Sequence, residues 1–137
     1  MEEERKQRCF DKIELAERRI LKISEILNKF DDETFKLACY KAFQEVIEAI
    51  TDIIAMILID RKKSVGDDYS NIEKIKEIIL LNEEEIAVLK EANGLRNRVI
   101  HEYNKTDDKK AKESISTLLP KIEEITNKIG KFVEKND

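Results

Sequence analysis

Apolar residues recur at every third or fourth position through most of this chain, which is the pattern of helices that bury one face. Residues 3–29 carry such a stripe between charged residues, formed by Ile13, Ala16, Ile20, Ile23 and Leu27. A second stripe follows Asp31 and Asp32, whose side chains can accept hydrogen bonds from the first turn of a helix. It extends for about eight turns and comprises Phe35, Ala38, Cys39, Ala42, Phe43, Val46, Ile47, Ile50, Ile54 and Ile57. The pattern predicts two helices, of which the second is long.

A loop is predicted over residues 63–69, where a glycine stands beside two aspartates. Ser70 and Glu73 have the spacing of a capping box, in which each side chain binds the backbone N–H of the other residue. This box predicts a short helix that ends near Leu81.

The remaining chain predicts two more helices. Asn82 with Glu85 forms a second capping box, and the helix that it opens is expected to meet Gly94 and resume through Tyr103. Thr106 is the expected cap of a last amphipathic helix, whose stripe consists of Ile115, Leu118, Leu119, Ile122, Ile125 and Ile129. These elements fit an antiparallel, up-and-down bundle of four to five helices.

The composition of the chain also favours an all-α fold. The chain has 137 residues, of which 41% are apolar, and this is enough for one compact domain with a core. Its three glycines and one proline are too few for the many tight turns of a β-rich fold. We therefore expect residues 1–137 to form a single all-α domain.

Charge and cysteine content narrow the range of functions. The 30 acidic residues outnumber 26 lysines and arginines, so a net charge of −4 provides no overall basic field, and any anion site must be local. Cys9 and Cys39 lack metal-ligand spacing and follow no secretory signal, so we expect no metal, no cofactor and a cytoplasmic location. The apolar run of residues 53–59 is too short to cross a bilayer, so no membrane association is expected.

The long second helix is predicted to be apolar on two sides. Its second side carries Ala49, Asp52, Ala55, Met56 and Ile59, opposite the main stripe, if each residue advances the helix by about 100°. One interpretation is that a second copy of the chain covers this side, which predicts a homodimer. The other is a central helix that its own neighbours surround, although Asp52 argues against a plain core.

The segment GLRNRVIHEY, residues 94–103, contains the only histidine of the sequence. On one helix, Arg96 and Tyr103 lie within about 20° of each other, inside the apolar face. A guanidinium in that position is costly unless it is paired, and its planar fork suits a carboxylate or a phosphate.

Two polar residues flank this arginine. Asn97 and His101, four positions apart, lie on a neighbouring side of the same helix. Asp52 in the second helix is the expected carboxylate partner of Arg96 or His101. Two interpretations follow: a functional anion site, or a structural ion pair between Arg96 and Asp52 with His101 at the surface, because such pairs also occur without function.

The arrangement Arg-x4-His-x-Tyr, formed by Arg96, His101 and Tyr103 and preceded by Gly-Leu, resembles the signature of the HEPN superfamily, specifically its HepT-like minimal toxins. The resemblance covers nearly the whole chain, because the helix lengths and an aspartate in the long second helix, Asp52, are similar as well. It implies a homodimeric, metal-independent endoribonuclease that cleaves RNA at a composite site where the motifs of two subunits meet. It also implies a type VII-like toxin-antitoxin pair, in which a minimal nucleotidyltransferase antitoxin adenylylates the motif tyrosine, here Tyr103.

The motif residues suit cleavage of RNA without a metal ion. Imidazole can transfer protons to and from the reacting oxygens, and a guanidinium can stabilise the phosphorane, so His101 and Arg96 are the predicted catalytic residues. Asn97 and Asp52 are predicted to orient them. One histidine cannot easily serve as both acid and base, whereas a two-fold dimer would supply two.

Three alternatives stay open. The same cleft could hold a nucleotide or a protein without cutting RNA, as in a non-catalytic binding module. Tyr103 could be a packed aromatic residue rather than an acceptor of AMP. Arg98 and Lys105 are either local contacts for RNA or solvated surface charges.

Overall fold

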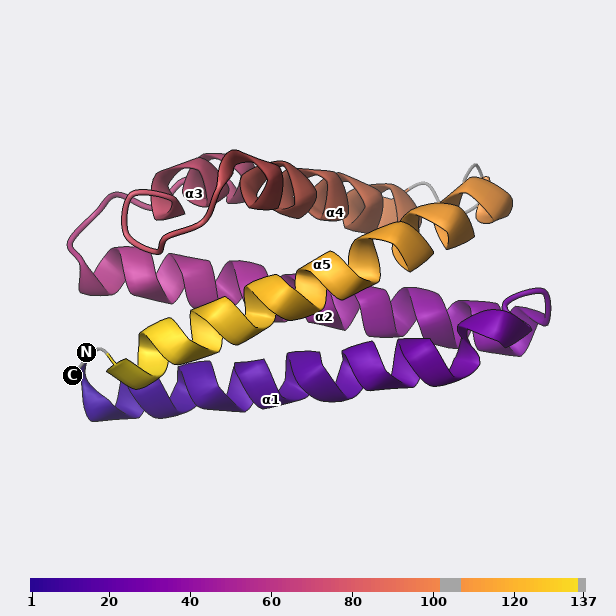
Figure 1. Ribbon diagram of the computed structural model, residues 1–137, viewed down its shortest axis with the longest axis horizontal. Coiled ribbons are helices and arrows are strands. Elements are labelled where there is room, and N and C mark those ends of the chain that lie inside the picture. Colours follow the sequence, from indigo (N-terminus) through magenta and orange to yellow (C-terminus); the bar gives the residue numbers. More distant parts are fainter. Residues whose placement is uncertain (102–106, 136–137) are drawn as a thin grey trace.

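The computed structural model describes residues 1–101 and 107–135, and every regular element in those ranges is a helix. Their order is α1 (Glu3–Ile26), a 3₁₀ turn (Leu27–Lys29), α2 (Glu33–Asp60), α3 (Asp68–Ile75), α4 (Glu83–His101) and α5 (Asp108–Lys135). Successive long helices run in opposite directions, so the start of α1 and the end of α5 lie side by side (Figure 1). The predicted all-α, antiparallel bundle is confirmed. No helix within the described ranges has the length and apolarity needed to span a membrane.

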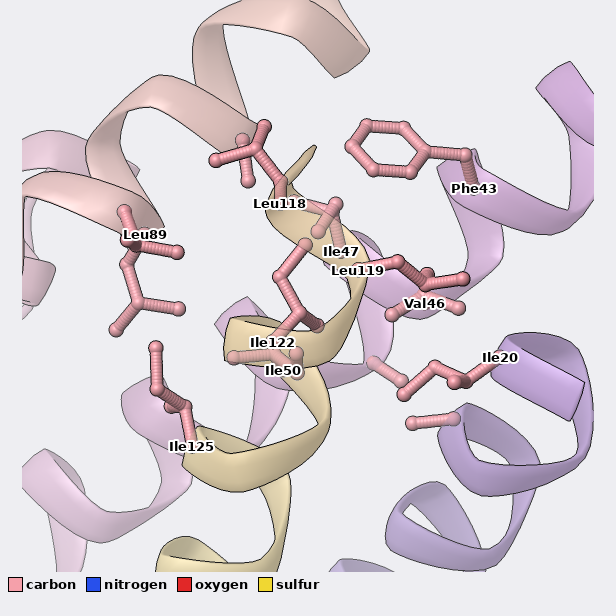
Figure 2. Close-up of a cluster of buried hydrophobic side chains, with 14 of the residues drawn as sticks. Ile20, Phe43, Val46, Ile47, Ile50, Leu89, Leu118, Leu119, Ile122 and Ile125 are labelled. Atoms are coloured by element: carbon pink, nitrogen blue, oxygen red, sulfur yellow. The ribbon is translucent and has the colours of Figure 1, made fainter. Parts of the chain in front are cut away.

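The core forms around α2. Helix α1 packs along one side of α2, α3 and α4 pack along another, and α5 closes the bundle across α1 and α4. Figure 2 shows Ile50 of α2, Leu89 of α4 and Ile122 of α5 within one cluster of buried side chains. Each branched side chain buried in this way stabilises the fold by roughly 1.5–3 kcal/mol. Packing of the apolar stripes therefore holds the helices together.

The second apolar side of α2 is largely covered within the chain. Ala49 is 3% exposed, and Met56 packs half-buried against the core. Asp52 and Ile59 are exposed. The interpretation of α2 as a central helix is therefore correct for Ala49 and Met56, and the predicted strip is not available as a whole to a second subunit.

Two helix starts follow the predicted capping. Asp32 accepts hydrogen bonds from the backbone N–H groups of Thr34 and Phe35. In the second box the backbone N–H of Asn82 donates to Glu85 Oε1 at 3.0 Å, and that of Glu85 donates to Asn82 Oδ1 at 2.8 Å. These bonds satisfy backbone donors that the first turn of a helix leaves unpaired.

The start of α3 differs from the prediction. Its cap is Asp67, whose side chain accepts a hydrogen bond from the backbone N–H of Ser70 at 2.8 Å. The cause is the buried Asn71, whose amide binds both backbone groups of Gly66 and so fixes the chain just before Asp67. Helix α3 therefore begins at Asp68, which places this residue in the first turn.

The end of α3 also differs from the prediction. The helix ends at Ile75 and does not continue to Leu81. Residues 76–82 turn so that Ile79 and Leu81 enter the core, while Leu80 between them is 93% exposed. A continuous helix could not bury these two side chains and expose the one between them in the same way.

The connection between α4 and α5 is described only at its ends. Helix α4 ends at His101, and the predicted positions of Tyr103 and Thr106 lie outside the described residues. Before α5, the side chain of Asp107 accepts a hydrogen bond at 3.1 Å from a backbone N–H of the first turn. This carboxylate therefore caps α5 in the way expected of a helix N-terminus.

Candidate active site

Arg96 lies on α4 where this helix faces α2 and α3. Its side chain is only 12% exposed, and its neighbours Ala92, Leu95 and Val99 on α4 are buried. The sequence-based placement of an arginine inside the apolar face is therefore correct. A guanidinium in such surroundings loses much of its hydration and needs partners of its own.

One edge of the Arg96 guanidinium is held by three oxygen atoms. Its Nε donates a hydrogen bond to Asn97 Oδ1 at 3.1 Å, and its Nη2 donates to Asp68 Oδ2 at 3.0 Å and to Asn93 Oδ1 at 2.9 Å. Asn93 is 1% exposed, so its oxygen has little access to water. These bonds occupy the Nε–H and both N–H groups of Nη2, and they fix the plane of the guanidinium.

The other guanidinium nitrogen, Nη1, faces α2. Glu48 Oε1 lies 3.9 Å from it, which is an ion-pair distance but too long for a hydrogen bond. The same oxygen accepts a hydrogen bond from Gln44 Nε2 at 3.0 Å. Within the part of the chain that the structure describes, Nη1 makes no hydrogen bond, and Glu48 is its charged neighbour.

Asp52 does not form the predicted ion pair with Arg96. Its exposed carboxylate binds Lys12 Nζ of α1 at 3.0 Å. Glu48, four residues and about 6 Å earlier along α2, lies near Arg96 instead. The prediction of an Arg96–Asp52 pair is therefore wrong.

The sequence argument missed the two residues that bind Nη2 of Arg96. The sequence could have indicated the contact with Asn93, because this residue stands three positions before Arg96 and thus on the same side of the helix. The sequence could not have indicated the contact with Asp68, because this contact depends on where α3 begins. That start is set by Asn71 rather than by a capping box.

Gly94 allows α3 to approach α4 closely. A Cβ atom at this position would lie 3.2 Å from the hydroxyl oxygen of Tyr69 and 3.6 Å from Nη1 of Arg98. Helix α4 passes through Gly94 without interruption, whereas the sequence predicts a helix that resumes after this glycine. Tyr69 follows Asp68 in the chain, so the missing side chain of Gly94 lets the first turn of α3 lie against α4 beside Arg96.

The other motif residues lie nearer to solvent. His101 is exposed in the last turn of α4, and Asn97 is half-buried with its oxygen bound to Arg96. Arg98 is exposed, and Tyr103 lies outside the described residues. The structure thus joins Arg96 with Asn97, and it leaves the imidazole of His101 accessible from outside the bundle.

A polar cluster ties the start of α5 to α2. The hydroxyl of Tyr40 donates a hydrogen bond to Asp108 Oδ1 at 2.5 Å, and Lys36 Nζ donates to Asp108 Oδ2 at 2.9 Å. The Tyr40 hydrogen bond is the main reason why the pKa of the Asp108 carboxyl lies below its ordinary value, and Lys36 adds to this effect. Both contacts hold in place the end of the connection that follows the motif.

A shallow groove lies next to the motif between α2 and α4. It has a volume of about 260 Å³ and is lined by Leu37, Tyr40, Lys41, Gln44, Val99 and Ile100. Leu37 and Ile100 are among the exposed large apolar side chains of the described residues. The surface beside the motif is therefore partly apolar, with the cationic Lys41 among its residues.

Comparisons of the sequence with known proteins find one family and several relatives. A family model described as "Ribonuclease HepT-like" matches residues 11–129. A protein of Archaeoglobus fulgidus named "Putative RNase" is 35% identical over 131 residues, which cover 96% of this chain and 97% of the relative. A second protein of that organism with the same name is 34% identical over 131 residues, covering 96% and 92% of the two chains.

Comparisons of the structure find the same fold in two solved complexes. A chain in the crystal structure of a toxin-antitoxin with AMP-PNP has a TM-score of 0.82 at 19% identity, covering 94% of this chain and 99% of that chain. A chain in the complex of a tri-AMPylated Shewanella oneidensis HEPN toxin with its MNT antitoxin has a TM-score of 0.71 at 18% identity. The two matched chains in this second case are covered to 98% and 96%.

Proposed function

This chain belongs to the HepT-like ribonuclease family of the HEPN superfamily, and from this premise we propose that it is a metal-independent endoribonuclease toxin. The observation that carries the proposal is the state of Arg96. Its Nε and Nη2 are held by hydrogen bonds to protein oxygens, while Nη1 has only the ion pair of 3.9 Å with Glu48 among the described residues. A fixed guanidinium and an exposed imidazole five residues later on the same helix are groups that suit the cleavage of a phosphodiester.

In the proposed reaction, one His101 imidazole removes the proton from the 2′-hydroxyl of the RNA. The 2′-oxygen then forms a bond to phosphorus, and Arg96 stabilises the negative charge of the phosphorane through Nη1. The bond between phosphorus and the 5′-oxygen breaks, and a second imidazole gives a proton to that oxygen. The products are a 2′,3′-cyclic phosphate and a 5′-hydroxyl. Asn97 supports this step by holding Nε of Arg96.

A homodimer would supply the second imidazole. The sequence contains one histidine, so one subunit cannot offer both an acid and a base of this type. We assign the dimer contact to the groove beside the motif, where Leu37 and Ile100 are exposed, because a two-fold axis near it brings two motifs together. Light scattering at micromolar concentration tests this assignment, and a monomer would contradict it.

The proposed partner is a minimal nucleotidyltransferase antitoxin that attaches AMP to Tyr103. An attached phosphodiester carries about one negative charge and would compete with RNA for Arg96. Tyr103→Phe should then fold and cut RNA, but the transferase with ATP should no longer silence it. Mass spectrometry that finds AMP on another residue, or silencing of the Phe variant, would contradict this assignment and favour a packed aromatic role for Tyr103.

Metal independence follows from the groups that the proposal uses. The described residues contain no cluster of three or more His, Cys, Asp or Glu side chains that could hold a metal ion. Imidazole and guanidinium supply the proton transfers and the positive charge, so EDTA should leave the rate of RNA cleavage unchanged. Loss of cleavage in EDTA that a divalent ion restores would overturn this part of the proposal.

A cytoplasmic location is proposed from the two thiols. Cys9 and Cys39 are both buried and free, and burial is the main cause that raises the pKa of each thiol. Such thiols are weak nucleophiles and suit a reducing compartment.

The decisive test is an RNA-cleavage assay on the purified protein with His101→Ala as its control. The side chain of His101 is exposed, so this substitution should leave the fold intact. We expect the wild type to cleave RNA and the variant to lose this activity. Binding of RNA or nucleotide without any cleavage by the wild type would replace the enzyme by a non-catalytic binding module. Equal cleavage by both proteins would exclude His101 as the acid or base.

A further inference from the structure

The first turn of α3 forms a support for Arg96. Asp67 caps this turn, the carboxylate of Asp68 accepts a hydrogen bond from Nη2 of Arg96, and Tyr69 lies against Gly94 of α4. Three successive residues thus start the helix, bind the arginine and contact the backbone next to it. This support is distant in sequence from the motif and comes from another helix.

We propose that Asp68 is a positioning residue of the ribonuclease site, and that the RNA phosphate binds the Nη1 side of Arg96. The inference rests on the proposed function. Asp68 does not touch the substrate in this proposal; it acts through Arg96. The hydrogen bond of 3.0 Å between Nη2 and Asp68 Oδ2 is the contact that carries it.

The hydrogen bonds of Arg96 explain why its orientation is fixed. An isolated arginine side chain samples many rotamers, and ordering it when substrate binds would cost free energy at that moment. Here Asp68 and Asn93 bind the two hydrogens of Nη2, and Asn97 binds the hydrogen of Nε. Because a guanidinium is planar, both hydrogens of Nη1 then lie in set directions before the phosphate arrives.

Glu48 does not occupy the hydrogens of Nη1 with a hydrogen bond. Its carboxylate is 3.9 Å away and bound to Gln44, so it contributes negative charge without using the hydrogens of Nη1. A phosphate oxygen can therefore take these hydrogens without breaking a protein hydrogen bond. Charge-assisted hydrogen bonds from arginine to phosphate are stronger than an ion pair at that separation.

The test compares Asp68→Asn with Asp67→Asn in the full-length protein. Both remove one negative charge from the start of α3, and asparagine caps a helix as well as aspartate does, but only Asp68 binds Arg96. We expect the kcat for cleavage of a short RNA to fall about tenfold to a hundredfold in Asp68→Asn. In Asp67→Asn it should change by less than about twofold. Asp68→Glu, which restores the carboxylate, should recover part of the lost kcat.

A binding measurement separates positioning from substrate affinity. The probe is the same oligonucleotide with a deoxyribose at the cleavage point, which lacks the attacking hydroxyl and is not cut. Its Kd should stay within about threefold of the wild-type value in Asp68→Asn, because the contact with Nη1 persists. A wild-type kcat in Asp68→Asn, or equal losses of kcat in both variants, would overturn the inference. If circular dichroism shows that Asp68→Asn is unfolded, Asp68→Glu decides instead: a lowered kcat with an unchanged Kd supports the inference, and a wild-type kcat overturns it.

An NMR measurement distinguishes failure of this inference from failure of the proposed function. The Nε–H of Arg96 is hydrogen-bonded, so its exchange with water should be slow in the wild type and in Asp67→Asn, and faster in Asp68→Asn. If the wild type cuts no RNA, the ribonuclease proposal fails, and this comparison still decides whether Asp68 holds Arg96. Equal exchange rates in the three proteins would overturn the positioning role even if RNA is cut.

Discussion

Two ion pairs join α3 to α4, and they lie in different surroundings. Glu73 Oε2 lies 2.6 Å from Lys90 Nζ, and the two side chains are 44% and 40% exposed. Asp68 binds Arg96, whose side chain is 12% exposed and also bonded to two asparagines. Both pairs connect the same helices, yet only the second requires a cation to leave water.

The difference shows which pair needs an explanation beyond stability. An exposed pair contributes about 0–1 kcal/mol, and α3 is already held by its buried residues Ile72 and Ile75. A buried guanidinium gives little net stability, because apolar residues of similar volume often stabilise a fold equally well or better. The proposed contact of Nη1 with an RNA phosphate would give the position of Arg96 such an explanation.

The largest effect on RNA cleavage should come from replacing the buried arginine by lysine. Arg96→Lys keeps the charge but cannot make three hydrogen bonds in one plane, so we expect RNA cleavage to fall by about a hundredfold or more. Lys90→Arg is the matched control, because an exposed pair with Glu73 tolerates either cation. Cleavage rates of the two purified variants provide the measurement. Similar rates would remove the functional distinction between the two pairs.

The two ion pairs should also differ in how much they contribute to the free energy of unfolding. Arg96→Ala leaves the buried oxygen of Asn93 without its donor, so the free energy of unfolding should fall by about 2 kcal/mol. Lys90→Ala should change it by no more than about 0.5 kcal/mol, because Glu73 remains hydrated. Urea unfolding of both variants measures these values. An equal loss in both would show that burial does not separate the pairs.

Most of the fold could be predicted from periodicity and capping. The stripes locate the long helices, and reciprocal capping gives the start of α4 through Asn82 and Glu85. The predicted start of the short helix α3 lies too far along the chain. Asp67 and Ser70 are both good helix caps, and the way in which Asn71 binds Gly66 decides between them. A side-chain contact of this kind leaves no periodic pattern in the sequence.

The candidate site could be predicted in part. The burial of Arg96 follows from its position within an apolar stripe, and that position also required a carboxylate partner. The sequence could not show which carboxylate pairs with Arg96, since Asp52, Glu48 and Asp68 all lie in neighbouring helices. Which of these carboxylates reaches Arg96 depends on how the helices cross and on where α3 begins, and both are tertiary features. Binding of Asp52 by Lys12 of α1 is one such feature.

A smaller effect should come from the contact between Gly94 and Tyr69. Alanine in the interior of a helix is favoured over glycine by about 0.5–1 kcal/mol, but its Cβ would lie 3.2 Å from the Tyr69 hydroxyl. In a Tyr69→Phe background, which lacks this oxygen, Gly94→Ala should give the full gain in unfolding free energy. With Tyr69 present the gain should be smaller by about 0.5 kcal/mol. A double-mutant cycle that finds no coupling would show that the first turn of α3 does not press on α4 beside Asp68.

The smallest effect is expected from the pH dependence of the exposed pair. Hydrogen bonds from Lys76 and then Lys90 hold the pKa of Glu73 at about 2, below its ordinary value of 4.5. A carboxyl whose pKa is lower in the folded protein stabilises the fold above pH 4.5, and this contribution is lost as the pH falls toward 2. Because water screens these exposed groups, the contribution should be small. The Tm of Glu73→Gln should thus lie slightly below that of the wild type above pH 4.5, and the difference should disappear near pH 2.

Glu77→Gln removes a charge nearby without a hydrogen bond to Lys76 or Lys90, and it should show no such convergence. A difference between wild type and Glu73→Gln that widens in acid would mean that Glu73 is not held by its lysines, and the contrast with Asp68 would then need another cause.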